Sequence, residues 1–350
     1  MRDIRESILE GRFLKFYSEK RALLHEDDLD NPVVMMERKP IKPRRLGDYE
    51  VHVAVEGFAS IRQISSGEIM HSRTPPLDEA RLLYVEQSRL AERLRPGGGG
   101  SEDPLVIWDV GLGAAANAMA AIQCYEAQAA AGGPLRAMHI VSFENDLDSL
   151  RLALTYNRDF LYLRHGGPAG LLENGQWESK EFPGLSWKLI KGDFLESLSR
   201  SQSLLSPPEL IFYDLFSRNS DSRPWTLDAF LRLLAACNGQ DTELFTYSSS
   251  TAVRATLLAA GFYVAKGRGI ADRAETTVAL AGSATAGEYE LLGPDWLAKW
   301  SRSQAKIPGW VLPDKQPAFE AAILGHPQFT AEFTLRHSPS TLPGDAQGWP

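Results

Sequence analysis

The chain has 350 residues, 43% of them hydrophobic, and a formal net charge of −8 at pH 7. This length accommodates one large α/β domain with additions, or two domains. The acidic balance argues against a strongly basic nucleic-acid surface, and no apolar run is long enough to span a membrane. The polar amino terminus, MRDIRESILEGR, does not resemble a signal peptide, so we expect a cytoplasmic protein.

The two cysteines and seven histidines do not indicate a metal site. Cys124 and Cys237 cannot form a disulfide framework or a cysteine cluster, and the histidines lack the spacing of paired ligands. We therefore expect no metal and a reducing compartment. The composition carries no information on oligomeric state.

The amino-terminal part is predicted to begin with a helix over 4–24. The loop ERKPIKPRR follows, with five cations in eight residues that could touch phosphates, although a solvated loop is the simpler interpretation. Alternating valines over 49–55 and the turn at Glu56-Gly57 predict a hairpin whose second strand lies near 60–64.

A second helix is predicted from Thr74-Pro75-Pro76 to Leu94, with Thr74 as its cap. The tract RPGGGGS at 95–101 is typical of a linker, and the main domain boundary is placed there. We expect an extension over 1–100, an α/β domain over 101–285 and an appendage over 286–350 that wraps the core and is loose at its end.

Strands and helices alternate beyond residue 101, which predicts a parallel sheet with helices on both faces. The last two strands are joined by a short polar loop and should form an antiparallel hairpin at the sheet edge. The glycine-rich segment 161–185 shows no clear element. Strands are predicted at 105–109, 139–143, 187–191, 210–214, 242–247, 262–267 and 276–281.

The stretch LVIWDVGLGAAANAMAAI, residues 105–122, organises this domain. A buried strand runs into a turn at Gly111 and Gly113, and an alanine-rich helix follows to about Ala131. A strand that meets a helix through glycines lets the backbone approach a ligand and directs free N–H groups toward it. The pattern GxGxxA also fits a dinucleotide fingerprint, and by itself it is weak.

Acidic residues stand at the ends of four consecutive strands: Asp109, Glu144, Asp193 after Gly192, and Asp214. A carboxylate beside the turn would repel a pyrophosphate and attract an ammonium group. Glu144 can accept from ribose hydroxyls and Asp193 from an adenine amino group. The pattern indicates S-adenosylmethionine, a zwitterionic adenosyl compound without phosphates, bound on a class I methyltransferase sheet.

Each of these residues also has a simpler interpretation. A lone Asp after a strand is usually a turn former or a helix cap, which applies above all to Asp193. Asn117 either reaches into the site or satisfies the backbone at the helix start. His71 is either a base or a hydrogen-bonded structural residue.

Six sequence islands stand in order between residues 67 and 262. They are GEIMHS with the following Asp78-Glu79-Ala80, DVGLGAAAN (109–117), Glu144 in SFEND, Gly192-Asp193, FYDLFSRNSDSRPWT (212–226) and LFTYSSSTAVRATLLAAGF (244–262). Together they resemble the methyltransferase domain of MnmC, the bacterial family that finishes 5-methylaminomethyl-2-thiouridine at the tRNA wobble position. The resemblance covers roughly residues 49–282.

The resemblance implies N-methylation of an aminomethyl group on tRNA. It implies a stand-alone form without the FAD domain, so another enzyme would deliver the aminomethyl group. Three positions depart from the family pattern: Ala115 replaces a glycine, Met70 stands where an aromatic residue is frequent, and Leu215-Phe216-Ser217-Arg218 replaces G-F-A-P.

Transfer to an amine requires a neutral nitrogen, and Asp214 is the candidate to receive or orient the departing proton. His71, Phe216 and Trp225 are candidate acceptor-binding residues. The two aromatic side chains could stack on an acceptor base or line the cofactor pocket. Three alternatives stay open: a methyltransferase with a non-tRNA acceptor, a nucleotide-dependent oxidoreductase, and a non-catalytic tRNA-binding or scaffold protein.

Overall fold

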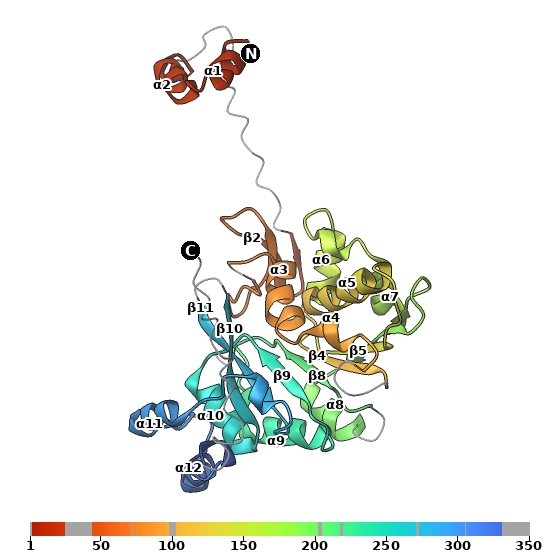
Figure 1. Ribbon diagram of the computed structural model, residues 1–350, viewed down its shortest axis with the longest axis vertical. Coiled ribbons are helices and arrows are strands. Elements are labelled where there is room, and N and C mark those ends of the chain that lie inside the picture. The colour runs from red at the N-terminus through yellow and green to blue at the C-terminus, as the bar shows by residue number, and fades with distance from the viewer. Residues whose placement is uncertain are drawn as a thin grey trace, which may run out of the picture. The chain divides into compact units, whose positions relative to one another are not determined.

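The computed structural model describes residues 2–24, 44–71, 73–97, 103–201, 205–217, 220–270, 273–304 and 306–330. The chain divides into two compact units, residues 1–43 and 44–350. In the first, α1 (Arg2–Leu9) and α2 (Phe13–Leu24) replace the single helix predicted over 4–24 (Figure 1). The chain turns between them at Gly11, where φ is +67°. Most of the basic loop lies outside the described residues.

The second unit begins with a small antiparallel sheet of β1 (Arg45–Leu46), β2 (Tyr49–Val53) and β3 (Ala59–Gln63), so the predicted hairpin is confirmed. Arg45 pairs with Glu50 at 2.7 Å, and Arg44 forms an ion pair with Asp159. The two described cations of the basic loop are therefore neutralised by acidic side chains of the same unit.

The helix predicted over 74–94 is broken into three pieces: α3 (Pro76–Ala80), the π-helical segment η1 (Arg81–Glu86) and α4 (Leu90–Arg93). Pro75 precedes the first turn without a side-chain cap, so Thr74 is not the cap. Arg89 interrupts the helix at φ +56°.

The extension from residue 44 onward shares one compact unit with the sheet. The backbone N–H of Arg136, before β5, donates to the carbonyl of Leu94 at 2.8 Å. The predicted boundary at 95–101 therefore does not separate the two units.

The main sheet has the strand order β10-β11-β9-β8-β4-β5-β7-β6. The five strands from β9 to β7 run parallel, while β10 and β11 form the predicted antiparallel hairpin at one edge. The seven predicted strands all form. They are β4 (Leu105–Val110), β5 (Met138–Glu144), β7 (Leu185–Lys191), β8 (Leu210–Tyr213), β9 (Glu243–Thr246), β10 (Tyr263–Ile270) and β11 (Arg273–Leu280).

Helices cover both faces of this sheet (Figure 1). Alternate residues of β4 feed two separate cores: Ile107 packs in the core under α5, and Trp108 in the core of the opposite face. The first face is covered by α5 (Ala116–Ala130), α6 (Asp148–Thr155) and α7 (Gly166–Asn174), and the second by α8 (Phe194–Ser201), α9 (Leu227–Ala236) and α10 (Thr251–Ala260).

The segment 161–185, in which no element was predicted, contains η3 (Leu161–Leu163), α7 and the short edge strand β6 (Gln176–Glu178). Glycines give α7 a poor intrinsic helix propensity. His165 Nδ1 caps the helix by accepting from the N–H of Gly167 at 3.0 Å. A Cβ atom at Gly170 would lie 3.1 Å from the Trp177 ring, so packing rather than propensity stabilises this helix.

After β11 the chain returns along the open edge of β10 at Leu291 and continues into α11 (Pro294–Arg302) and α12 (Gln316–Leu324), the second of which contacts α10. The backbone N–H of Leu292 donates to Val264, and the Gln328 amide bonds both backbone groups of Val264. These contacts satisfy an edge that would otherwise be open to pairing with another chain. The predicted loose end, 331–350, lies outside the described residues. None of the described helices has the length and apolarity needed to cross a membrane.

Candidate active site

The turn after β4 adopts left-handed backbone conformations at Gly111 (φ +93°), Gly113 (φ +51°) and Ala115 (φ +64°). A Cβ atom at Gly111 would lie 2.6 Å from the carbonyl oxygen of Asp214, so only glycine fits there. Ala115 occupies the third glycine position of the family pattern in a conformation that costs an alanine about 1 kcal/mol. Ala115 therefore keeps the left-handed backbone conformation of this turn, although the family pattern has glycine at this position.

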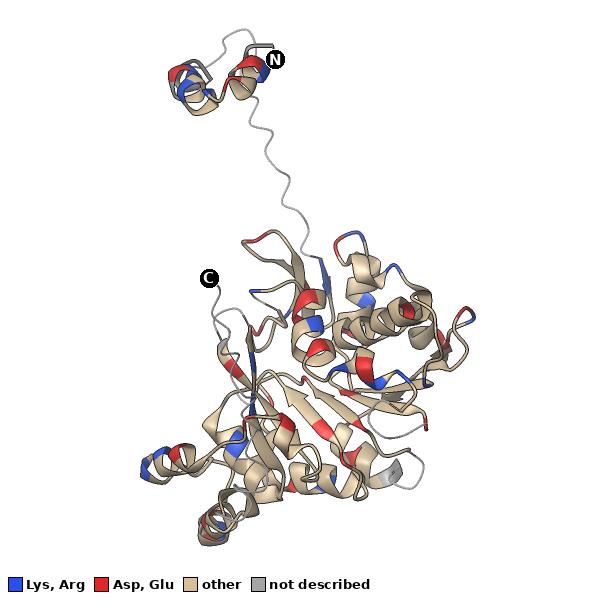
Figure 2. Ribbon diagram, viewed as in Figure 1, with Lys and Arg blue, Asp and Glu red and all other residues tan. Residues whose placement is uncertain are grey.

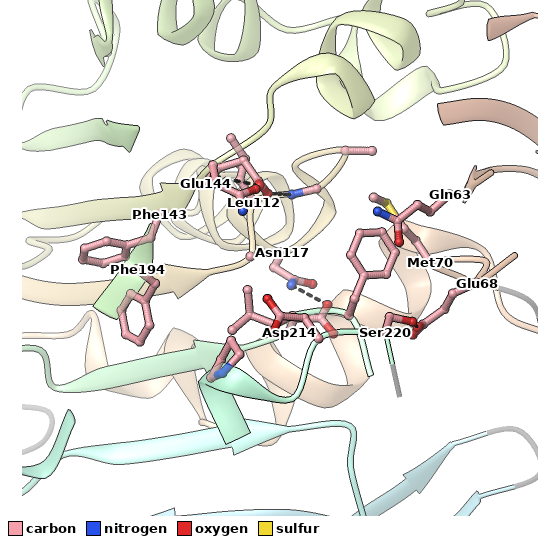
Figure 3. A pocket seen from close by; sticks show the side chains of 18 of the residues that line it. Gln63, Glu68, Met70, Leu112, Asn117, Phe143, Glu144, Phe194, Asp214 and Ser220 are labelled. Carbon is pink, nitrogen blue, oxygen red and sulfur yellow. Dashed lines mark hydrogen bonds between the residues drawn. The ribbon is translucent and has the colours of Figure 1, made fainter. Parts of the chain in front are cut away.

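One pocket opens at the carboxyl ends of β4, β5, β7 and β8, beside the loop that follows β3 (Figure 3). It brings together nine of the predicted site residues and leaves out two, Asp109 and Trp225. The nine are His71, Gly111, Gly113, Asn117, Glu144, Gly192, Asp193, Asp214 and Phe216.

Glu144, at the end of β5, is held by three backbone groups. One carboxylate oxygen accepts from the N–H of Gly113 at 3.0 Å, and the other accepts from those of Asn145 and Asp146 at 2.9 and 3.1 Å. Desolvation raises the pKa of this carboxyl, and the three N–H donors act in the opposite direction. The result is a rigid carboxylate whose remaining lone pairs can accept from ligand hydroxyls.

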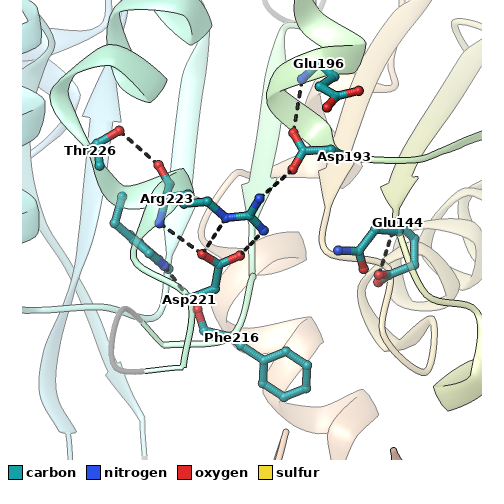
Figure 4. A network of polar contacts seen from close by, with 9 residues as sticks. Glu144, Asp193, Glu196, Phe216, Asp221, Arg223 and Thr226 are labelled. Carbon is teal, nitrogen blue, oxygen red and sulfur yellow. Dashed lines mark hydrogen bonds and ion pairs between the residues drawn. The ribbon is translucent and has the colours of Figure 1, made fainter. Parts of the chain in front are cut away.

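Asp193 follows Gly192 and caps α8, because its Oδ1 accepts from the N–H of Glu196 at 3.1 Å. Its Oδ2 accepts from Arg223 at 3.3 Å (Figure 4). Arg223 is held by Asp221 through its backbone N–H and its guanidinium, an arrangement that lowers the pKa of Asp221. The helix-cap interpretation is thus confirmed, and the same carboxylate also lines the pocket.

Asn117 and Asp214 meet across the pocket, with Asn117 Nδ2 donating to Asp214 Oδ2 at 2.8 Å (Figure 3). The Asn117 side-chain oxygen is buried and has no partner among the described residues. Desolvation raises the pKa of Asp214, while the charge of His71 and the Asn117 hydrogen bond lower it. Asn117 therefore points into the site, as one of its two interpretations predicted, and leaves an acceptor atom for a ligand.

Asp109 does not reach the pocket. Its side chain is 1% exposed and accepts from Ser142 Oγ at 2.6 Å, and Ser142 in turn accepts from Trp187 Nε1 at 2.8 Å. Burial raises the pKa of Asp109 to about 7. The carboxylate lies inside the sheet because Asp109 belongs to β4 and hydrogen-bonds sideways to β5, so it is not among the residues that line the pocket.

Trp225 is also buried, at 1% exposure, and cannot stack on an acceptor. Its ring packs edge-on against Tyr213 and Tyr247, and its Nε1 donates to the carbonyl of Phe216 at 3.1 Å. Trp225 therefore holds the backbone of the loop that carries Phe216 and Asp214.

The amino-terminal extension supplies pocket residues that sequence reasoning missed. Glu68 accepts from the N–H and hydroxyl of Ser217 at 2.9 and 3.0 Å, and also from Ser220 Oγ. The Tyr49 ring lies 6.5 Å from that of Phe216, with an angle of 15° between the planes. The island GEIMHS contained a signal for Glu68, whereas nothing in the sequence marked Tyr49. Further lining residues are Gln63, Ile69, Met70, Glu79 and Tyr247.

Carboxylates dominate the electrostatics of this pocket. Among the described lining residues, Arg223 is the one permanently charged cation, and it is paired with Asp193 and Asp221. Such a site disfavours a dinucleotide pyrophosphate and suits a phosphate-free ligand that carries ammonium and hydroxyl groups. The acidic lining residues are Glu68, Glu79, Glu144, Asp193, Asp214 and Asp221.

Comparison with known families decides the class of ligand. A family model described as S-adenosyl-L-methionine-dependent methyltransferase matches residues 173–281, which contain Asp193 and Asp214. The chain therefore carries an S-adenosylmethionine-dependent methyltransferase domain. Its cofactor is S-adenosylmethionine, and the glycine turn, the strand-end carboxylates and the free Asn117 oxygen fit that molecule.

Known relatives of this methyltransferase domain are of the MnmC kind. The domain is 28% identical over 219 residues to the tRNA 5-methylaminomethyl-2-thiouridine biosynthesis bifunctional protein MnmC of Pseudomonas fluorescens (strain Pf0-1), a match that covers 59% of this chain and 31% of the relative. The corresponding protein of Pseudomonas paraeruginosa (strain PA7) is 27% identical over 244 residues, covering 67% and 35%. The chain thus spans about a third of the length of these curated relatives.

A solved structure confirms the fold. The crystal structure of MNMC2 from Aquifex aeolicus superimposes with a TM-score of 0.55 at 22% identity, covering 80% of this chain and 86% of that one. The Rossmann-like methyltransferase fold predicted from the sequence is therefore present, with a small antiparallel sheet added at its amino-terminal side.

Proposed function

We propose that the methyltransferase domain N-methylates a primary amine, namely the aminomethyl group of a modified wobble uridine in tRNA. The observation that carries the proposal is Asp214, a desolvated carboxylate fixed by Asn117 in the same pocket as the cofactor-binding turn. The tRNA acceptor is supported by what the names of the MnmC relatives state about those proteins.

The residues that would hold the cofactor surround the glycine turn. The backbone of Gly111 and Gly113 would approach it closely, Glu144 would accept from the ribose hydroxyls, and Asp193 from the adenine amino group. The unpartnered Asn117 oxygen would accept from the ammonium group of its amino-acid portion. When bound, S-adenosylmethionine supplies an electrophilic methyl group.

Asp214 would take the proton that the acceptor must lose. An ammonium group has no lone pair, so the acceptor nitrogen must be neutral before it can react. Desolvation raises the pKa of Asp214 and makes it a better proton acceptor than an exposed carboxylate. The Asn117 hydrogen bond fixes its orientation.

Phe216 would stack on a planar acceptor base. It is partly buried, lines the pocket two residues after Asp214, and is backed by the nearly parallel ring of Tyr49. Stacking of a base on an aromatic side chain is worth about 1–3 kcal/mol. Tyr49, at 5% exposure, supports Phe216 from the extension.

The test is incubation of the protein with labelled S-adenosylmethionine and bulk tRNA from a strain that lacks the final methylation, followed by nucleoside analysis. We expect label in a 5-methylaminomethyl nucleoside. Asp214→Asn should reduce turnover by at least about 10²-fold while calorimetric affinity for S-adenosylhomocysteine stays within about tenfold. Cofactor affinity that collapses in this variant would instead assign Asp214 to cofactor binding.

A second candidate is methyl transfer to an acceptor that is not tRNA, namely a small cationic amine. The net charge of −8 favours it, and Lys and Arg are distributed among Asp and Glu over the described part of the chain rather than gathered on one element in this view (Figure 2). Transfer of label to small amines but not to tRNA would establish this candidate. Salt-dependent tRNA binding without cofactor affinity would instead indicate a non-catalytic tRNA-binding protein.

A further inference from the structure

A histidine and a glutamate of the extension form a pair inside the pocket, with the histidine buried and the glutamate partly buried. His71 is 9% exposed, and its Nδ1 lies 3.1 Å from Glu79 Oε2 on α3. The backbone N–H of His71 donates to Ser60 Oγ at 3.0 Å, so both the ring and the backbone are held in place. A carboxylate facing Nδ1 favours the tautomer with the proton on Nδ1, which leaves the lone pair of Nε2 free.

His71, Glu79 and Asp214 line the same pocket. When protonated, His71 lowers the pKa of Asp214, and the charge of Glu79 raises it. Asp214 and Glu79 both raise the pKa of the buried Tyr84 hydroxyl on η1. The other groups that face this cluster are Asn117, which bonds Asp214 from α5, Asp109 beneath it in β4, and Tyr247 near Tyr84.

The position of His71 and Glu79 matters because the proposed reaction requires Asp214 to lose a proton between turnovers. Each turnover would leave a proton on Asp214, which lies partly buried in the pocket. Asp214 must be deprotonated again before the next acceptor ammonium can be neutralised. An imidazole with a free Nε2 lone pair, backed by a carboxylate, is the side chain suited to accept that proton near neutral pH.

We propose that His71, oriented by Glu79, is the proton acceptor that restores the carboxylate of Asp214 after it has deprotonated the acceptor amine. The N–H bond of the ammonium breaks, its electron pair stays on nitrogen, and the proton passes to Asp214 and then to Nε2 of His71. The imidazolium is stabilised by Glu79 until it releases the proton to solvent. This inference rests on the proposed amine acceptor. His71 acts on that acceptor only through Asp214, and Glu79 is a positioning residue for His71.

The kinetic test compares His71→Asn and Glu79→Gln with the wild type over pH 6 to 10, using 5-aminomethyluridine as acceptor. We expect kcat to fall about 10²-fold for His71→Asn and less for Glu79→Gln at pH 7, with KM changed less than about threefold. The deficit should shrink toward pH 10, because the acceptor amine then loses its proton to solvent. Glu79→Asp should recover part of the rate.

Matched controls lie on the same elements. His52→Asn alters a histidine of β2 that is outside the pocket, and Asp78→Asn alters the neighbour of Glu79 on α3. Both should retain wild-type rates at every pH. Calorimetric affinity for S-adenosylhomocysteine should be unchanged in all variants. A deficit that is constant with pH, or that accompanies loss of this affinity, would overturn the proposal in favour of a purely structural role.

An NMR measurement separates failure of this inference from failure of the proposed function. Imidazole ¹⁵N shifts should show the Nδ1–H tautomer for His71 in the wild type, as the contact with Glu79 requires. The other tautomer overturns the proton path. The expected tautomer without methylation of any amine would contradict the proposed function and leave the His71–Glu79 pair established. His71→Gln serves as a second variant if His71→Asn does not fold.

Discussion

The carboxylate of Glu68 accepts hydrogen bonds from both the backbone N–H and the hydroxyl of Ser217, a residue 149 positions later in the chain. This contact ties the extension to the loop that carries Asp214 and Phe216. In the family pattern a glycine and a proline stand in this loop, whereas here the serine supplies the bonds that hold it. The hydrogen bonds to Ser217 therefore join the described part of the altered loop to the extension.

Glu68→Ala should loosen this loop without affecting the cofactor half of the pocket. The variant leaves the Ser217 N–H and two serine hydroxyls without their charged acceptor, which should lower the free energy of unfolding by about 1–3 kcal/mol. We expect KM for the acceptor to rise about tenfold while calorimetric affinity for S-adenosylhomocysteine is retained. Glu56→Ala, at the exposed hairpin turn, is the control and should change neither quantity.

Glu144→Ala should weaken binding of S-adenosylmethionine by an order of magnitude or more. The substitution removes a carboxylate that three backbone donors hold in one orientation, and with it the proposed acceptor of two ribose hydroxyls. Calorimetric titration measures the effect, with Glu173→Ala on the exposed part of α7 as the control. An unchanged dissociation constant for Glu144→Ala would refute the ribose role.

Gly111→Ala should destabilise the fold far more than a glycine substitution without a steric clash. The new Cβ would lie 2.6 Å from a backbone carbonyl oxygen, at φ +93°, so we expect a loss of about 3 kcal/mol or more. Gly132→Ala provides the comparison, since Gly132 has φ +84° and open space around it, and only conformational strain of about 1 kcal/mol is expected. Urea unfolding of both variants distinguishes clash from strain, and equal losses would contradict the close approach.

Asp109 should make stability fall with rising pH. Its pKa is raised from 3.8 to about 7 by burial, so between these values the folded protein retains a proton that the unfolded chain has released. Its contribution is therefore fully present below about pH 4 and is lost as the pH rises through 7. In Asp109→Asn the fall in the free energy of unfolding from pH 4 to 8 should be smaller by up to about 4 kcal/mol.

Urea unfolding at a series of pH values measures this difference for Asp109→Asn, the wild type and a control. Asp228→Asn, on the exposed side of α9, should follow the wild-type curve because this aspartate is largely in solvent. Parallel curves for Asp109→Asn and the wild type would show that Asp109 does not titrate in this range.

Much of the cofactor half could be predicted because its signals are local. Gly111 and Gly113 mark a turn between an apolar strand and an alanine-rich helix, and Glu144 and Asp214 each stand where a predicted strand ends. Parallel strands place their carboxyl ends at one edge of the sheet, so residues at those ends converge without any knowledge of side-chain packing.

Elements that depend on packing rather than on their own propensity could not be predicted in this way. The glycine-rich helix α7 is stabilised by Trp177 rather than by its own propensity. The interruption at Arg89 places that side chain in an ion pair with Glu288 and over the ring of Tyr289, both some 200 residues later. No pattern within the helix 74–94 contains this information.

The order of strands and turns along the chain, and with it the position of the pocket, was determined by the sequence itself, because hydrophobic periodicity and glycine act over a few residues. The tertiary structure alone decided which side chains enter the pocket. Asp109 is turned into the sheet by Ser142, and Trp225 is buried under the loop that it bonds, whereas Tyr49 and Glu68 arrive from the extension. Such placements depend on partners far along the chain, because a buried side chain needs hydrogen-bond partners for its polar atoms and neighbours that cover its apolar surface.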